Sequence, residues 1–130
     1  SFLPMKRAII SQFAPEPIGP YNQAILKGDT LYMSGQIAIN PITNDLVLND
    51  IKAESHQVMK NILAVLKAAD MTIDQVVKTT IFLKKMEDFE AVNAVYGSYF
   101  CDSIAPARET VAVLGLPKNV NIEISMIAIR

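Results

Sequence analysis

Alternating apolar and polar residues in the first forty positions predict β-strands. The expected strands are Arg7–Ile10, Asn22–Lys27 and Thr30–Ile39. Gly28-Asp29 separates the last two, and glycine at the first central position of a two-residue turn favours a type II′ hairpin. Between the first two strands, the segment Ala14–Pro20 contains three prolines, which remove backbone donors, so we expect an irregular loop there.

Helical periodicity replaces this alternation in the middle of the chain. Apolar residues recur every three to four positions over about residues 51–69, which predicts a helix with Asp50 as its N-cap. Asp70 follows where a left-handed residue commonly ends a helix. Residues 76–83 are β-branched and apolar, as in a buried strand, and a second helix is expected from about residue 88 to residue 101.

The last third of the chain is expected to contain two strands joined by a short turn. The elements are a strand at residues 110–114, a turn at Leu116–Asn119 and a strand at residues 120–129. If the strands pair antiparallel, Thr110 lies opposite Glu123 and Arg108 opposite Ser125. All four side chains would then share one face of the sheet, because strand side chains alternate between faces.

The expected order of elements is therefore β-β-β-α-β-α-β-β. It predicts an α+β sandwich in which two helices cover one face of a mixed sheet. With 130 residues, of which 51% are hydrophobic, the chain is expected to form one domain, residues 1–130, with its own core. Met5 is a candidate natural start, which would make residues 1–4 a cloning remnant.

Composition narrows the function. Lys and Arg number 12 against 13 Asp and Glu, a net charge of −1, which argues against binding to nucleic acid. One cysteine and one histidine are too few for an internal disulfide or a Cys/His zinc site. We see no secretory leader and no run of about 18 to 20 apolar residues, so we expect a cytoplasmic protein without a membrane partner. Any catalysis should rest on Arg, Glu or Tyr.

Arg108 and Glu123 are the candidate chemical groups. The simplest interpretation is a cross-strand ion pair, worth about 0 to 1 kcal/mol when exposed. Two features favour a site instead. The strand face that carries Glu123 and Ser125 continues with the apolar residues Ile127 and Ile129. This face should therefore be partly covered, for example by another subunit. The Ala-Pro-Ala segment at residues 105–107 comes directly before Arg108, and its proline restricts the backbone there. Arg108 is therefore expected at the start of a strand beside a rigid loop, a common position for the edge of a pocket.

Six segments occur in an order and at a spacing that match one known family. They are IGPYNQA at 18–24, SGQI at 34–37, VKTT at 77–80, FEAVNAVY at 89–96, PAR at 106–108, and LP at 116–117 with IEI at 122–124. Through them residues 6–130 resemble the RidA family, also called YjgF, the reactive intermediate deaminases. The resemblance implies a chorismate-mutase-like fold that assembles as a homotrimer, with a ligand cleft at each subunit interface.

The resemblance also implies imine hydrolysis without a metal or cofactor. Arg108 would bind the substrate carboxylate, since a planar guanidinium pairs with it bidentately, and Glu123 would position the attacking water. The implied substrates are 2-imino acids, such as 2-iminobutanoate and 2-iminopropanoate. Water adds to the C=N carbon, and ammonia leaves to give the 2-keto acid. Such imines hydrolyse unaided, so the catalyst mainly orients the reactants.

Substrate-binding roles are implied, by the same resemblance, for Tyr21, Ser34, Gly35, Asn93 and Thr110. Tyr21 would line the pocket, although a loop tyrosine packed on its neighbours is the alternative. Gly35 would let the backbone approach the ligand, or would mark a β-bulge. Asn93 falls on the apolar stripe of its helix, where an amide also serves as a structural hydrogen-bonder. Thr110 stands where the family often has cysteine.

Three further residues are expected to lie outside the cleft. Glu109 stands where the family usually has Ser or Thr, and alternation places it on the face opposite Arg108. Cys101 is expected to be a buried small hydrophobe. His56 lies away from the apolar stripe of its helix and is expected on the solvated surface.

Two other functions stay open. The cleft could sense a small carboxylate, such as a 2-keto acid, without turnover. Glu123 favours the enzyme, because a carboxylate binder has little use for an acidic group beside its arginine. Ribonuclease activity or translation inhibition, attached to some relatives, is disfavoured by the near-neutral charge.

Overall fold

The computed structural model describes residues 5–130. Its six strands are β1 (Arg7–Ile9), β2 (Ala24–Lys27), β3 (Thr30–Met33), β4 (Val76–Leu83), β5 (Ala107–Ala112) and β6 (Ile122–Ile129). Its α-helices are α1 (Ile51–Ala68) and α2 (Phe89–Ser98), and short 3₁₀ helices lie at Ile73–Gln75, Met86–Asp88 and Pro117–Asn119. This confirms the expected order of strands and helices. The suggested remnant at residues 1–4 lies outside the described residues.

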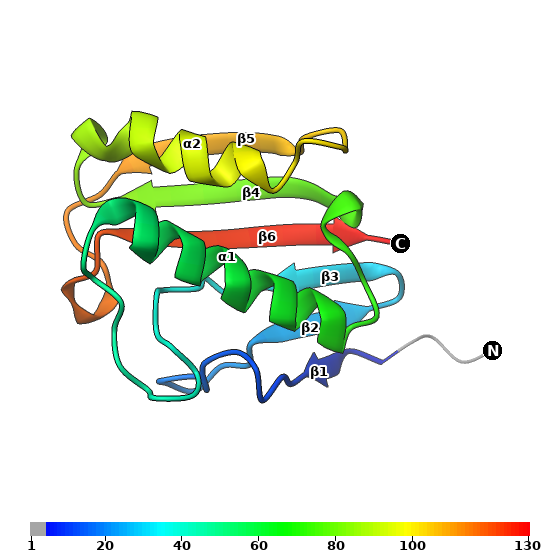
Figure 1. Ribbon diagram of the computed structural model, residues 1–130. Coiled ribbons are helices and arrows are strands. Elements are labelled where there is room, and N and C mark those ends of the chain that lie inside the picture. The colour runs from blue at the N-terminus through cyan, green and yellow to red at the C-terminus, as the bar shows by residue number, and fades with distance from the viewer. Residues whose placement is uncertain (1–4) are drawn as a thin grey trace.

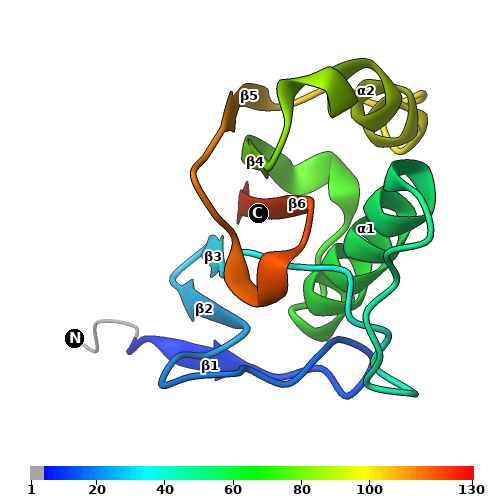
Figure 2. The same ribbon diagram turned by 90° about the vertical axis from the view of Figure 1, so that its left-hand side faces the viewer.

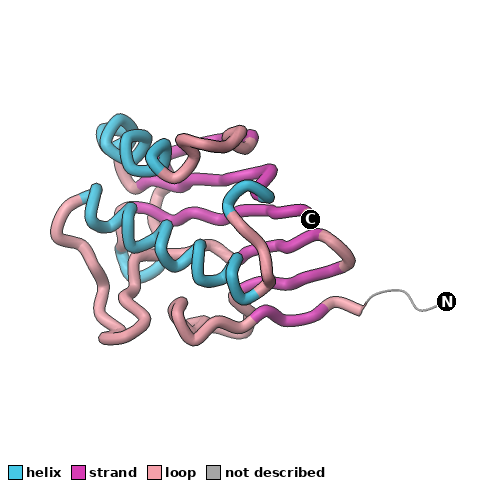
Figure 3. The backbone as a smooth tube through the Cα atoms, turned by 45° about the vertical axis from the view of Figure 1, so that its right-hand side comes forward, coloured by secondary structure: helices cyan, strands magenta, loops and turns pink. Residues whose placement is uncertain are grey.

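All six strands form one sheet in the order β1-β2-β3-β6-β4-β5. The β4 and β5 pair is parallel, and the other neighbouring pairs are antiparallel. Figures 1 and 2 show α1 and α2 on one face of this sheet, and the tube view in Figure 3 distinguishes these helices from the strands by colour. The predicted α+β class, with a mixed sheet and two helices on one face, is confirmed.

The β2–β3 hairpin forms at the predicted turn. Lys27 pairs with Thr30, and Gly28 has a φ of 58°. Strand β3 is shorter than expected: it ends at Met33 and does not continue to residue 39. Beyond it the Asn61 side chain on α1 donates hydrogen bonds to the carbonyls of residues 37 and 39, at 3.1 and 3.0 Å, which holds this segment against the helix.

Helix α1 provides much of the core. Its fully buried apolar residues are Val58, Met59, Ile62, Val65 and Leu66. Asp50 caps the helix as predicted, since its side chain accepts a hydrogen bond from the Ala53 N–H at 2.8 Å. Asp70 has a φ of 55°, which confirms the expected left-handed end. No helix within residues 5–130 is both long and apolar enough to cross a bilayer.

The expected antiparallel pairing of the last two strands is wrong. β5 pairs in parallel with β4, and β6 lies between β3 and β4. The reason is helix α2, which connects β4 to β5: a strand, a helix and a strand in succession form a crossover unit whose strands run parallel. Thr110 therefore lies opposite Ile81, while Glu123 lies opposite Phe82.

The second helix is shorter than predicted, which corrects the placement of Cys101. α2 ends at Ser98, so Cys101 falls in the following turn and is exposed, not buried. His56 is exposed, as expected, with its Nδ1 3.0 Å from the hydroxyl of Tyr99.

Candidate functional site

The two candidate chemical groups lie on opposite faces of the sheet. On β4, Thr79 is the partner of Arg108 and Phe82 is the partner of Glu123. Paired residues share a face and the two β4 residues are three positions apart, so their faces differ. Arg108 faces the helices with the fully buried Thr79, and Glu123 lies on the uncovered face. The expectation that Arg108, Thr110, Glu123 and Ser125 share one face is wrong.

We call the two parts of the site the glutamate half and the arginine half. The glutamate half comprises Tyr21, Ser34, Gly35 and Glu123. The arginine half comprises Phe89, Asn93, Tyr96, Arg108 and Thr110. Within one chain the structure therefore brings together the members of each half but does not bring the halves together.

Gly35 leaves room for the Glu123 side chain. A Cβ atom at this position would lie 2.5 Å from Oε2 of Glu123 and 2.6 Å from its Cδ, too close for any real contact. The backbone is fixed there by two hydrogen bonds, from the Gln36 N–H to the Ile124 carbonyl at 2.8 Å and from the Ile124 N–H to the Gln36 carbonyl at 3.1 Å. The structure thus places Gly35 against the Glu123 carboxylate, and the expected approach of its backbone to a ligand stays a prediction.

The Glu123 carboxylate is half-buried and has no hydrogen-bond donor among the described residues. Its side chain is half-buried, and this desolvation raises the pKa of the carboxyl group above its usual value. Within residues 5–130 no side chain and no backbone N–H donates a hydrogen bond to it. A carboxylate with a raised pKa and unused acceptor atoms suits a general base for water.

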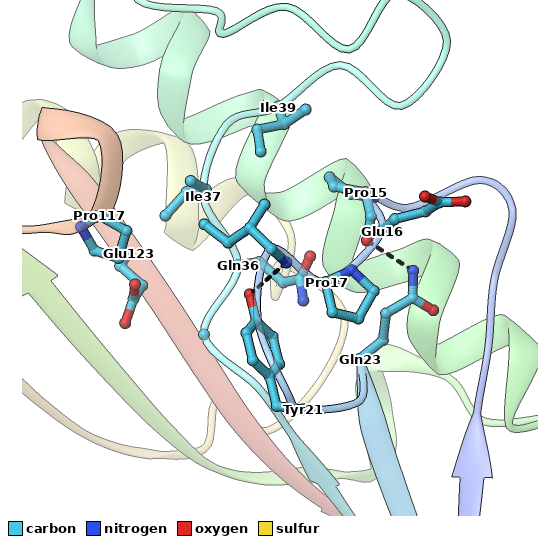
Figure 4. Close-up of a pocket in the computed structure, with 12 residues that line it drawn as sticks. Pro15, Glu16, Pro17, Tyr21, Gln23, Gln36, Ile37, Ile39, Pro117 and Glu123 are labelled. Carbon is cyan, nitrogen blue, oxygen red and sulfur yellow. Dashed lines mark hydrogen bonds between the residues drawn. The ribbon is translucent and has the colours of Figure 1, made fainter.

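Tyr21 and Glu123 both line one small pocket, shown in Figure 4. The Ile18 N–H donates a hydrogen bond to the Tyr21 hydroxyl at 3.2 Å. Because the hydroxyl oxygen accepts this bond, its own proton remains available for a ligand or water. Ser34 stands next to Gly35, but its hydroxyl already donates to the Asn22 carbonyl at 2.6 Å.

Gln23 holds the loop that carries Tyr21. The residue is only 4% exposed. Its Oε1 accepts the Ser11 N–H at 2.6 Å, and its Nε2 donates to the carbonyls of Ser11, Ala14 and Pro15 at 3.0, 3.2 and 2.8 Å. Sequence reasoning missed this role, although an amide at the start of an apolar strand after a proline-rich loop was the available signal.

The pocket itself is too small to enclose a substrate. Tyr21, Gly35 and Glu123 line it together with Ile37 and Pro117, and its volume is about 40 Å³. That space suits a few water molecules, whereas ligand pockets usually measure about 300 to 1,000 Å³. The glutamate half is thus one wall of a site and needs a second wall.

The arginine half is built on α2, β4 and β5. The Arg108 guanidinium carbon lies 4.9 Å from the centre of the Tyr96 ring and 5.8 Å from that of Phe89. Asn93 lies between these two aromatic residues on α2 and is half-buried. The hydroxyl oxygen of Thr110 is buried without a hydrogen-bond partner among the described residues. This half therefore presents a cation and an unsatisfied polar atom.

Glu109 points away from Arg108, as alternation predicts. Its carboxylate forms an ion pair with Lys78 at 2.5 Å and accepts a short hydrogen bond from Thr80. The hydrogen bonds from Lys78 and Thr80 lower the pKa of Glu109. The carboxylate next in sequence to Arg108 is thus engaged on the other face of the sheet.

Comparisons with known proteins agree on one group of relatives. The family described as Endoribonuclease L-PSP matches residues 11–130. A RutC family protein of Pyrococcus horikoshii is 48% identical over 97% of this chain and 99% of its own length. The 2-iminobutanoate/2-iminopropanoate deaminase of Escherichia coli is 42% identical over 97% of this chain and 99% of its own. The crystal structure of YyfA, a Rid family protein from Yersinia pestis, has a TM-score of 0.95 and 50% identity, covering 97% of this chain and 100% of that one.

Proposed function

Because this chain belongs to the Endoribonuclease L-PSP family, which includes the RidA proteins, we propose that it is an imine deaminase. It would convert 2-imino acids, such as 2-iminobutanoate and 2-iminopropanoate, to 2-keto acids and ammonia, in the cytoplasm. The observation that carries the proposal is Glu123, a half-buried carboxylate with a raised pKa and free acceptor atoms in a pocket of water size. The name of the Escherichia coli relative supports the same reaction.

The site would be completed by a homotrimer. Arg108 and Glu123 lie on opposite faces of one sheet, so a single chain cannot offer both to one small substrate. The uncovered face carries exposed apolar side chains, among them Tyr32 at 52% and Val111 at 45% exposure, as expected of a surface that packs against another chain. The arginine half of one subunit would then close the pocket of the glutamate half of its neighbour.

The proposed mechanism divides the work between the halves. Arg108 binds the carboxylate of the 2-imino acid and fixes its C=N carbon near Glu123. Glu123 takes a proton from a water molecule as the water oxygen bonds to that carbon, and it passes this proton to the imine nitrogen, giving a 2-amino-2-hydroxy acid. Glu123 then transfers the hydroxyl proton to the amino nitrogen as the C–N bond breaks, so that the nitrogen departs as ammonia and the 2-keto acid is left as product. Tyr21, whose hydroxyl proton is free, would donate a hydrogen bond to the water or the substrate.

A coupled assay tests the activity. A threonine dehydratase generates 2-iminobutanoate in solution, and the rate of imine loss or ammonia release is followed with and without the protein. We expect catalysis above the spontaneous rate, and Arg108→Ala should remove it. The absence of any increase, across imines with several side chains, would contradict the deaminase proposal.

Mixing two inactive variants tests the shared cleft. Arg108→Ala and Glu123→Gln are each expected to be inactive, but in randomly mixed trimers some clefts pair the intact half of one variant with the intact half of the other. Refolding them together in equal amounts should restore about a quarter of the native activity, since each half of a cleft is intact in half of the cases. A site contained in one chain would show no recovery.

A binding protein without turnover is the second candidate, because a relative such as the Pyrococcus horikoshii protein carries only a RutC family name. It would use the same arginine to bind a 2-keto acid. Calorimetry with 2-oxobutanoate separates the two functions. Binding that is lost in Arg108→Ala, together with no catalysis in the coupled assay, would favour the sensor.

A further inference from the structure

We infer that Phe89 and Tyr96 are positioning residues, which form an aromatic cradle that holds Arg108 ready for an anionic ligand. This inference rests on the proposed carboxylate-binding role of Arg108. The cradle is defined by the two rings and the guanidinium carbon between α2 and β5, at 5.8 Å from the Phe89 ring and 4.9 Å from the Tyr96 ring.

Within residues 5–130 no carboxylate neutralises the charge of Arg108. Among residues 5–130 the one ion pair joins Lys78 to Glu109. Glu109, the carboxylate nearest to Arg108 in sequence, is a member of that pair. It lies on the opposite face of the sheet, where Thr80 donates a second hydrogen bond to it. A half-buried guanidinium without a carboxylate partner keeps its full attraction for an anion.

Aromatic rings hold the guanidinium without occupying its donors. A ring attracts a cation through its face, whereas a carboxylate partner would take up N–H groups. Arg108 donates no hydrogen bond to any described residue, so its fork of N–H donors stays available for a bidentate contact. An arginine fixed by a carboxylate would have to break that pair before it could bind a substrate.

The rings are themselves fixed by the fold. Tyr96 is 6% exposed, and its hydroxyl donates a hydrogen bond to the hydroxyl of Thr79 on β4 at 2.9 Å. The Phe100 ring packs against Tyr96 with centroids 4.8 Å apart. Phe89 begins α2 two turns before Tyr96, which places both rings on the same side of the helix. The fold itself therefore holds the two rings of the cradle in place.

This arrangement predicts that the rings control binding of the substrate and not the chemical step. Without a ring, the long arginine side chain gains rotamers that point away from the ligand, so binding must order it again. The affinity for a carboxylate should fall, while the water and Glu123, which belong to the other half, should be unaffected. KM should rise with little change in kcat.

The test measures 2-oxobutanoate binding by calorimetry and imine hydrolysis by the coupled assay. We expect about tenfold weaker binding for Tyr96→Leu and about threefold for Phe89→Leu, with KM rising by the same factors and kcat within about twofold. Tyr96→Phe keeps the ring and should bind within about twofold of the native protein. Tyr99→Leu removes a tyrosine near the same helix end that contacts His56 instead, and it serves as the matched control.

A double-mutant cycle separates the cradle from a general packing effect. In an Arg108→Ala background, Phe89→Leu should weaken residual 2-oxobutanoate binding no further, because its effect acts through Arg108. Phe89 is half-buried at a helix start, so this variant serves if Tyr96→Leu does not fold. Native-like binding in both ring variants, with binding lost in Arg108→Ala, would overturn the cradle and leave the proposed function standing. Binding of native affinity in Arg108→Ala would instead contradict the anchoring role of Arg108 itself.

Discussion

The two halves of the site are held in place by different means. The arginine half lies on regular structure, with Arg108 on β5 and its two rings on α2. The glutamate half lies where loops meet the sheet, and only Glu123 stands on a strand. Packing between a helix and a sheet can orient an aromatic ring, but a loop has few apolar contacts with which to fix its course. The glutamate half therefore depends on hydrogen bonds.

Three buried polar side chains supply those bonds. Gln23 holds the loop before β2, Asn61 holds the segment after β3, and Glu54 holds the start of β6. None of the three is more than 4% exposed. Each bonds to backbone groups that regular secondary structure leaves unpaired, which is how irregular segments become rigid. The comparison separates a half whose geometry rests on apolar packing from one whose geometry rests on buried polar contacts.

Gly35→Ala should damage the glutamate half most. The new methyl group would collide with the Glu123 carboxylate, because a Cβ there lies 2.5 Å from Oε2. Gly35 is not among the residues with positive φ, so alanine fits the backbone and the effect arises from moving Glu123. We expect kcat to fall by about 100-fold, as for a catalytic group displaced by about 1 Å. The coupled imine assay measures it.

Gly97→Ala is the matched control for that substitution. A Cβ at Gly97 would meet no atom within 4 Å, and the residue lies inside α2, so activity should stay native and unfolding should become harder by about 0.5 to 1 kcal/mol. In Gly35→Ala the binding of 2-oxobutanoate should remain within a few-fold of native, since Arg108 is untouched. If binding and turnover fell together, the two halves would not be separable.

Glu54→Gln should weaken the fold beneath the glutamate half. The Glu54 carboxylate is fully buried and accepts the Asn121 N–H at 2.8 Å, its side-chain amide at 2.7 Å and the Ile122 N–H at 3.3 Å. Glutamine has one acceptor oxygen instead of two, so at least one of these donors loses its partner, at a cost of about 2 kcal/mol. Chemical denaturation measures the free energy of unfolding. The substitution Glu87→Gln, at an exposed position, should leave the free energy of unfolding unchanged. An equal decrease in both variants would contradict the stabilising role of the Glu54 hydrogen bonds.

Local patterns predicted most of the fold. The hairpin at Gly28, the cap at Asp50 and the left-handed residue at Asp70 depend on neighbours in sequence, so they could be read from the chain and are confirmed. The partner of β5 could not be read this way, because a short turn before β6 suggests a hairpin while the preceding helix demands a parallel crossover to β4. The helical connection determines that β5 pairs in parallel with β4, and β6 lies between β3 and β4.

The same limit applies to the site. Motifs singled out Tyr21, Gly35 and Glu123, and the structure places all three in one pocket. They did not predict that Arg108 lies on the other face, since that follows from the pairing of strands far apart in sequence. Nor could they reveal that Gly35 makes room for a side chain 88 positions later in the chain. Contacts of this kind exist only once the sheet order is known.

The smallest predicted effect concerns the two glutamates that lie on the uncovered face. Desolvation raises the pKa of Glu123 in the folded protein, so folding favours the protonated carboxyl group. This contribution to stability is fully present below the pKa of the unfolded chain and is lost as the pH rises through the pKa of the folded protein. Glutamine cannot ionise, so Glu123→Gln should match the native melting temperature near pH 4 and exceed it at neutral pH. Glu109 has the opposite sign, because Lys78 and Thr80 lower its pKa and its contribution is present above the unfolded pKa. Glu109→Gln should therefore melt at or below the native temperature at neutral pH, and melting curves between pH 4 and 8 compare all three proteins. If the melting temperatures of Glu123→Gln and Glu109→Gln changed with pH in the same way, the opposite pKa shifts of Glu123 and Glu109 would be contradicted.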